Sequence, residues 1–183
     1  FAIAIGRNAA KLVQGSKAVS IGDYAGQTSQ GGDCIAIGGC SGHLSQKPGA
    51  VAIGKLAGST GQTNSATAVG YGAGQTSQGN SGVAIGYLAA NTGQGSHSTA
   101  VGREAGNAAQ GIESVAVGYQ SGKTSQATAS VAIGRLSGSI SQQTLCVAIG
   151  NRAGESAQQG HSVAIGYQSG RYNQASRCVA IGD

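Results

Sequence analysis

The stretch Ser130-Val131-Ala132-Ile133-Gly134 decides the fold, because versions of it return every sixteen residues along the whole chain. Its closing glycine recurs without a gap, at Gly6, Gly22, Gly38, Gly54, Gly70, Gly86, Gly102, Gly118, Gly134, Gly150, Gly166 and Gly182. A fixed period of this length is typical of a solenoid, in which identical small units stack on one another. We therefore expect residues 1–183 to form a single array of about eleven 16-residue repeats.

The composition also favours a solenoid over one round core. Gly, Ala, Ser, Gln and Thr dominate, Trp and Met are absent, and Phe1 is the only Phe. Such residues bury too little apolar area for an ordinary core, whereas a solenoid coil needs only a thin one. Disorder is the alternative for a Gly- and Ser-rich chain, but disorder tolerates drift in spacing and this chain shows none. The chain begins inside a repeat and without Met, so we expect a piece excised from a longer chain.

The Val-Ala-Ile unit predicts a short strand with one buried face, because β-branched residues alternate with alanine. We expect the outer two residues, Val131 and Ile133 in this copy, to fill the core of the coil. Two such strands and two turns account for sixteen residues, so the predicted fold is all-β, a parallel β-solenoid of the two-sided β-roll type.

The middle residue of the unit is then expected to point outward, and it is Ala in every copy except Ser20. A free solvent-facing position would vary as the turns do, so persistent alanine predicts close packing against another chain. The alternative is that Ala only avoids crowding inside one chain. The candidate subunit interface is Ala36, Ala52, Ala68, Ala84, Ala100, Ala116, Ala132, Ala148 and Ala164.

A glutamine column is the most specific polar feature of the repeat. It contains Gln14, Gln30, Gln46, Gln62, Gln78, Gln94, Gln110, Gln126, Gln142, Gln158 and Gln174. Stacked amides can donate from one coil to the next, and a buried amide without partners costs about 1–3 kcal/mol, so we expect a structural ladder. The alternative is a row of glutamines that recognises a ligand.

Two glycine positions recur in each coil. The invariant glycine after the strand predicts a turn with positive φ or no room for a Cβ atom. The second glycine, four residues later, becomes Ala at Ala10 and Ala90, so its constraint is expected to be steric and not torsional. Ala or Ser precedes it throughout, as at Ala25 and Ser41, which predicts a second inward position.

The position after the invariant glycine holds long side chains. The candidate recognition column is Tyr71, Tyr87, Arg103, Tyr119, Arg135 and Tyr167. Tyr and Arg often anchor recognition surfaces, and a ladder of them would sum repeated weak contacts through multivalency. The alternative is a solvated corner where long side chains lie over the turn.

No pattern typical of catalysis or of a metal or cofactor site is found. The histidines His43, His97 and His161 belong to separate coils, and the carboxylates are scattered. The four cysteines are expected to be free thiols, because Cys146 and Cys178 lie two coils apart, roughly 9.6 Å. We therefore expect no enzyme activity and no cofactor.

Charge and hydropathy exclude two further classes. The net charge of +5 comes from scattered Lys and Arg, so nucleic acid binding is not expected. No apolar run approaches the roughly 20 residues of a membrane span, so this segment is not expected to insert into a membrane.

The Ser-Val-Ala-Ile-Gly unit, at 130–134 and 162–166, resembles the head repeats of YadA-type trimeric autotransporter adhesins. It is also similar to repeats in predicted viral and phage fibre proteins. The resemblance implies a left-handed β-roll, a homotrimer, and an extracellular place on a cell or virion surface. It also implies a ligand on a host surface or in the matrix.

Three functions remain open. The chain is expected to be a rigid segment of a surface fibre or adhesin that presents multivalent binding surfaces. A virion fibre or a self-assembling filament with a purely structural role is the first alternative. An ice-binding solenoid is the second, because flat solenoid faces with regular Thr rows serve that purpose. One column holds Thr28, Thr60, Thr76, Thr92 and Thr124, but also Leu12, Leu44, Ala108, Ile140 and Tyr172.

Overall fold

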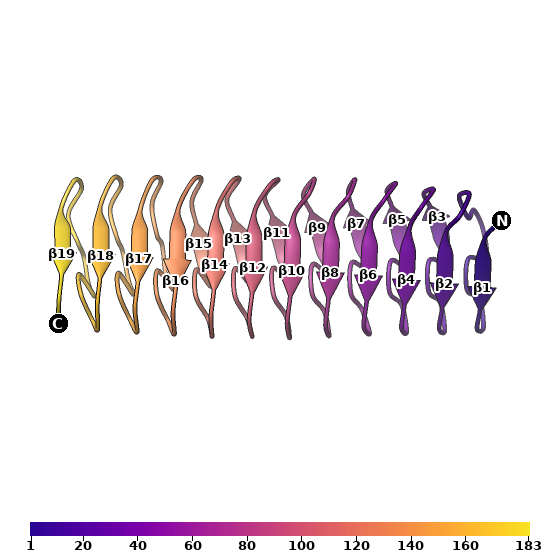
Figure 1. Cartoon of the computed structure of the whole chain (residues 1–183), viewed down its shortest axis with the longest axis horizontal. Coiled ribbons are helices and arrows are strands. Elements are labelled where there is room, and N and C mark those ends of the chain that lie inside the picture. Colours follow the sequence, from indigo (N-terminus) through magenta and orange to yellow (C-terminus); the bar gives the residue numbers. More distant parts are fainter.

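The computed structural model describes all 183 residues as one straight rod of stacked coils, with the two termini at opposite ends (Figure 1). Every regular element is a strand of three residues, and no helix is present. Each coil contributes one strand to a continuous parallel sheet, so the chain is an all-β parallel β-solenoid, as the period predicts.

The continuous sheet, which we call sheet A, contains twelve parallel strands, one from each Val-Ala-Ile unit. They pair in register across one period, for example Val83 with Thr99 and Ile85 with Val101. The strands are β1 (Ile3–Ile5), β2 (Val19–Ile21), β4 (Ile35–Ile37), β6 (Val51–Ile53), β8 (Thr67–Val69), β10 (Val83–Ile85), β12 (Thr99–Val101), β14 (Val115–Val117), β16 (Val131–Ile133), β17 (Val147–Ile149), β18 (Val163–Ile165) and β19 (Val179–Ile181).

The opposite sheet, sheet B, contains seven strands that end at the repeating glutamine. They are β3 (Thr28–Gln30), β5 (Leu44–Gln46), β7 (Thr60–Gln62), β9 (Thr76–Gln78), β11 (Thr92–Gln94), β13 (Ala108–Gln110) and β15 (Thr124–Gln126). The middle residue of these strands is left-handed, as at Ser77 with φ 56°, so only the outer two residues pair. Beyond β15 the sheet continues as single bridges, from Thr124 to Ile140 and onward to Tyr172.

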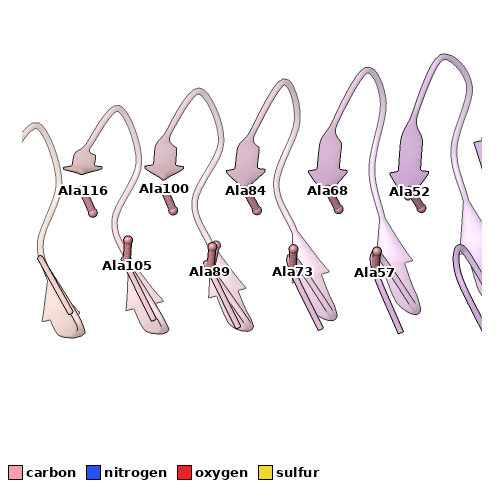
Figure 2. Close-up of a cluster of buried hydrophobic side chains, with 10 residues drawn as sticks. Ala52, Ala57, Ala68, Ala73, Ala84, Ala89, Ala100, Ala105 and Ala116 are labelled. Atoms are coloured by element: carbon pink, nitrogen blue, oxygen red, sulfur yellow. The ribbon is translucent and has the colours of Figure 1, made fainter. Parts of the chain in front are cut away.

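The core between the sheets is built from alanine and other small residues, and the expectation that Val and Ile fill it is wrong. In Figure 2, Ala52, Ala68 and Ala84 of sheet A point toward Ala57 and Ala73 of the opposite wall. All five are 0% exposed. The β-branched residues on either side of each sheet A alanine point outward instead. Successive side chains of a strand point to opposite faces, so the alternating pattern fixes which residues share a face but not which face is buried.

The candidate subunit interface is therefore wrong as well. Every alanine proposed for it is 0% exposed: Ala36, Ala52, Ala68, Ala84, Ala100, Ala116, Ala132, Ala148 and Ala164. Alanine persists there because the position faces the narrow interior, packed against small residues of the opposite wall and beside the glutamine amides, so no other chain can reach it. Crowding inside one chain, the alternative that the sequence left open, is the correct explanation.

The glycine turns set the path of the chain between the sheets. Gly118 has φ 125°, and a Cβ atom there would lie 2.6 Å from the carbonyl oxygen of Gly134, so both predicted constraints act together. The second glycine is also left-handed, as at Gly58 with φ 51°, which contradicts the purely steric prediction. Ala90 occupies that position with φ 44°. The preceding small residue is buried, as predicted.

Candidate functional site

The glutamine column is a buried structural ladder, which confirms the prediction. The Gln46 Nε2 atom donates to Oε1 of Gln62 at 3.1 Å, and the Gln46 side chain is 0% exposed. The same nitrogen lies 2.9 Å from the carbonyl oxygen of Ile35 and 3.1 Å from that of Ala50. The amides from Gln30 to Gln174 therefore link neighbouring coils and also join sheet B to sheet A. Burial of the amide leaves no surface on which it can recognise a ligand.

The ladder consists of two separate runs. The first joins Gln30, Gln46, Gln62 and Gln78, and the second joins Gln94, Gln110, Gln126, Gln142, Gln158 and Gln174. Between the runs, Oε1 of Gln94 is buried and has no hydrogen-bond partner. Gln14 donates to backbone carbonyls and not to Gln30.

The outward side chains of sheet A form an apolar surface that the sequence analysis assigned to the core. We call it the Val/Ile face, and it comprises the first and third residue of every sheet A strand. Ile85 is 40% exposed, and Ile133 and Ile165 are each 37% exposed. Only Thr67 and Thr99 interrupt the aliphatic rows.

The Val/Ile face is large for a single chain. Twelve coils at ~4.8 Å make it about 55 Å long, and two rows of side chains make it roughly 10 Å wide. Its area is therefore on the order of 500 Å² or more, at the upper end of the ~300–600 Å² that monomers usually expose. Patches of this size are often functional, so the Val/Ile face is a candidate interaction surface.

The turn after each invariant glycine, up to the fifth residue, forms one long border of the rod, which we call the Tyr/Arg edge. The rings of Tyr71 and Tyr87 stack here with centroids 5.4 Å apart and 12° between their planes. The guanidinium carbon of Arg103 lies 5.6 Å from the ring centroids of both Tyr87 and Tyr119. Arg135 follows at 5.9 Å from Tyr119. The structure thus brings five members of the recognition column into one stack.

Tyr167, the sixth member of the column, stands apart from this stack. Asn151 occupies the coil between Arg135 and Tyr167, so the stack ends at Arg135. The hydroxyl of Tyr167 accepts a hydrogen bond from Nε2 of Gln168 at 2.9 Å, and the side chain is 54% exposed.

A carboxylate anchors the middle of the Tyr/Arg edge, and sequence reasoning missed it. Glu104 lies 2.7 Å from Nζ of Lys123 and 3.3 Å from Nε of Arg103, and it accepts a hydrogen bond from Gln120 at 3.0 Å. Hydrogen bonds from Lys123 and Gln120 lower the pKa of Glu104 below its ordinary value. The sixteen-residue step between Glu104 and Gln120 was the available signal, because it places the two side chains on neighbouring coils.

The surface of the rod has no pocket. No group of three or more His, Cys, Asp or Glu side chains is placed to hold a metal ion. All four cysteines are free, with Cys34 and Cys146 buried and Cys178 exposed. The structure contains no helix with the length and apolar character that a membrane crossing requires.

Compared with known proteins, the chain matches no protein-family model, no curated protein and no solved structure.

Proposed function

We propose that the chain is a non-enzymatic rod segment of an extracellular surface fibre, which assembles with further copies of itself through the Val/Ile face. The exposed double row of β-branched side chains carries this proposal. Removing it from water contributes about 25 cal/mol per Å² of apolar area, and a flat, rigid sheet loses little conformational entropy when it is covered. The resemblance to adhesin heads favours three copies.

The Tyr/Arg edge complements this role. In an assembly joined through sheet A, the edge remains on the outside and repeats along the fibre. Repeated weak contacts of this kind sum through multivalency, which suits adhesion to a host surface or matrix. A virion or phage fibre, or a filament with a purely structural role, would assemble through the same Val/Ile face. It would differ only in that the Tyr/Arg edge binds no ligand.

The native mass of the chain in solution tests the assembly. We expect light scattering to give a multiple of the 17.7 kDa chain mass for the wild type. The double variant Ile85→Lys/Ile133→Lys should reduce the mass to that of one chain, because buried unpaired lysines oppose association. Circular dichroism should show that the variant keeps its sheet, since both positions lie outside the core.

A matched control uses the outer face of sheet B. Thr76→Lys/Thr124→Lys adds the same charge at exposed positions of the opposite sheet. This variant should keep the wild-type mass. A wild type that remains a single chain at micromolar concentration would refute assembly through the Val/Ile face, and an equal effect of both variants would assign the loss to charge alone.

Ice binding is a second candidate, and the flatness of sheet A favours it. The outward side chains recur at one per coil in two parallel rows, and all are Val, Ile or Thr, which are β-branched. Thermal hysteresis of the isolated chain tests this function. A measurable freezing-point gap that the Ile85→Lys/Ile133→Lys variant abolishes would support it, and its absence would leave the fibre proposal.

A further inference from the structure

The Tyr/Arg edge offers chemical features that narrow the class of ligand it fits. Its aromatic and cationic groups stack on one another from Tyr71 to Arg135, so both faces of the Tyr87 and Tyr119 rings and one face of the Tyr71 ring lie against a neighbour. The hydrogen-bond donors of this stack are the phenol hydroxyls and the guanidinium N–H groups. Tyr71, Tyr87 and Tyr119 are 43%, 48% and 38% exposed. The edge therefore presents hydrogen-bond donors at one level per coil.

The same edge concentrates positive charge. From residue 55 to residue 155 it carries two carboxylates, Glu104 and Glu155, and five cations, which are Lys55, Arg103, Lys123, Arg135 and Arg152. Glu104 is engaged by Lys123 and Arg103, and Glu155 pairs with Arg171. No carboxylate lies within ion-pair distance of Lys55, Arg135 or Arg152. The excess charge and the row of donors both favour an anionic ligand.

We propose that the Tyr/Arg edge binds a linear anionic polysaccharide that lies parallel to the rod axis, with about one sugar unit per coil. The inference rests on the proposed function, since it names the ligand class of the exposed rod. The coil height of ~4.8 Å is close to the length of one pyranose unit in an extended chain. Arg103 and Arg135 lie two coils apart and would each meet a sulfate or carboxylate, with the hydroxyl of Tyr119 between them.

The geometry disfavours other anionic polymers. An extended acidic peptide presents side chains on one side every ~6.6–6.8 Å, which does not keep step with coils at ~4.8 Å. Single-stranded nucleic acid gains much of its affinity from bases that stack on open aromatic faces, and here neighbours already occupy both faces of the Tyr87 and Tyr119 rings. A small anion would find no enclosed site, because the surface has no pocket.

Binding to immobilised heparin, a sulfated polysaccharide, and alginate, a carboxylated one, tests the proposal. The wild type should bind both, and Arg103→Gln/Arg135→Gln should weaken binding at least about tenfold, because two charge-assisted contacts are lost. The double variant Tyr87→Phe/Tyr119→Phe keeps the rings and removes only the hydroxyls. We expect it to weaken binding by a smaller factor.

The matched control removes the same charge from the opposite edge. Lys17→Gln/Lys47→Gln lies at exposed positions there and should change binding by no more than about twofold. Equal losses in the Arg and Lys variants would overturn the proposal, as would no wild-type binding to either polysaccharide. Tighter binding to a single-stranded oligonucleotide or to polyglutamate would assign the edge to another polymer and overturn it too.

Light scattering on the same samples separates this inference from the assembly proposal. The Arg103→Gln/Arg135→Gln variant should keep the wild-type mass, because neither side chain belongs to the Val/Ile face. Binding that depends on these arginines in a protein that remains a single chain would support the ligand class and refute only the assembly. A full-size assembly that binds neither polysaccharide would do the reverse.

Discussion

Gly82 and Ala90 lie on either side of the Gln94 carboxamide, and each departs from the residue found at its repeat position in neighbouring coils. In a coil with glycine at the second turn position, such as Gly74, an added Cβ would lie 2.7 Å from Oε1 of its own glutamine. Ala90 carries that methyl group, so Gln94 must shift. Gly82 leaves the room, since a Cβ there would lie 2.9 Å from Oε1 of Gln94. The shift leaves Oε1 of Gln94 unpaired and divides the ladder.

Replacing Ala90 by glycine should therefore stabilise the protein. The change relieves a left-handed alanine, worth about 1 kcal/mol, and lets Gln94 accept from Gln78. The greater freedom of glycine in the unfolded chain offsets part of this gain, so we expect about 1 kcal/mol net from urea unfolding. Gly82→Ala alone should destabilise the protein, whereas the same change combined with Ala90→Gly should be tolerated. Additive effects in this double-mutant cycle would contradict the coupling.

The ladder itself is tested by Gln110→Leu. The substitution removes donations to the carbonyl of Thr99 and to Gln126, and it leaves the incoming N–H of Gln94 without its acceptor. Several buried polar groups lose partners, so we expect a loss of about 2–5 kcal/mol in the free energy of unfolding. Gln143→Leu, at the exposed position that follows the ladder residue Gln142, should change it by under about 0.5 kcal/mol. An unchanged urea midpoint for Gln110→Leu would show that the ladder does not contribute to stability.

The two glycine positions should differ in their tolerance of alanine. At Gly134, φ is 123° and an added Cβ would lie 2.5 Å from the carbonyl oxygen of Gly150, which cannot move without breaking the stack. At Gly138, φ is 49° and the nearest atoms belong to the side chain of Gln142. Thermal unfolding should show a loss of more than about 3 kcal/mol for Gly134→Ala and about 1–2 kcal/mol for Gly138→Ala. A reversed order would contradict this distinction.

Acid should weaken the Tyr/Arg edge. The pKa of Glu104 is lower in the folded chain than its ordinary value of 4.5, because Lys123 and Gln120 donate to its ionised form. The stabilisation is therefore complete above pH 4.5 and disappears as the pH falls through the lower folded-state pKa. Comparing the stability of the wild type with that of Glu104→Gln from pH 6 to pH 3 should show a difference under about 1 kcal/mol that vanishes in acid.

The titration of Asp23 does not affect this comparison. Its pKa is also lowered, by the hydrogen bond from Arg7, but it titrates in both proteins and cancels in the difference. A difference between wild type and Glu104→Gln that grows as the pH falls would contradict the assignment.

Thiol labelling should distinguish the cysteines. Burial raises the pKa of Cys34, so its thiol stays protonated and is shielded at pH 8. Iodoacetamide should modify the exposed Cys178 in the folded protein and reach Cys34 and Cys146 only in urea. Mass spectrometry of the digested protein reads out each site. Labelling of Cys34 in the folded state at the rate of Cys178 would contradict the buried position.

Much of the architecture could be predicted from the repeat alone. The unbroken step of the glycine and glutamine columns predicts stacked coils in register, because any other arrangement would bring unlike residues together. The inward amide at Gln110 and the tight turn at Gly118 follow from the same periodicity. The recognition column within the Tyr/Arg edge was also predicted, although the period could not show that Asn151 ends the stack, and Glu104 was missed.

The amino-acid sequence by itself determined the coil length, the parallel register and the two columns that stabilise the stack, because these depend only on what repeats. The tertiary structure decided which side of each strand faces inward. Left-handed residues at the corners, including Leu56 with φ 62° and Ser65 with φ 54°, turn the chain sharply, and leucine carries no sequence signal for that conformation. Sharp corners bring the two sheets so close that the sheet A positions facing inward, such as Ala68, hold only small residues beside the buried glutamine amides. Val and Ile are therefore excluded from the core, and the Val/Ile face lies on the outside of the rod.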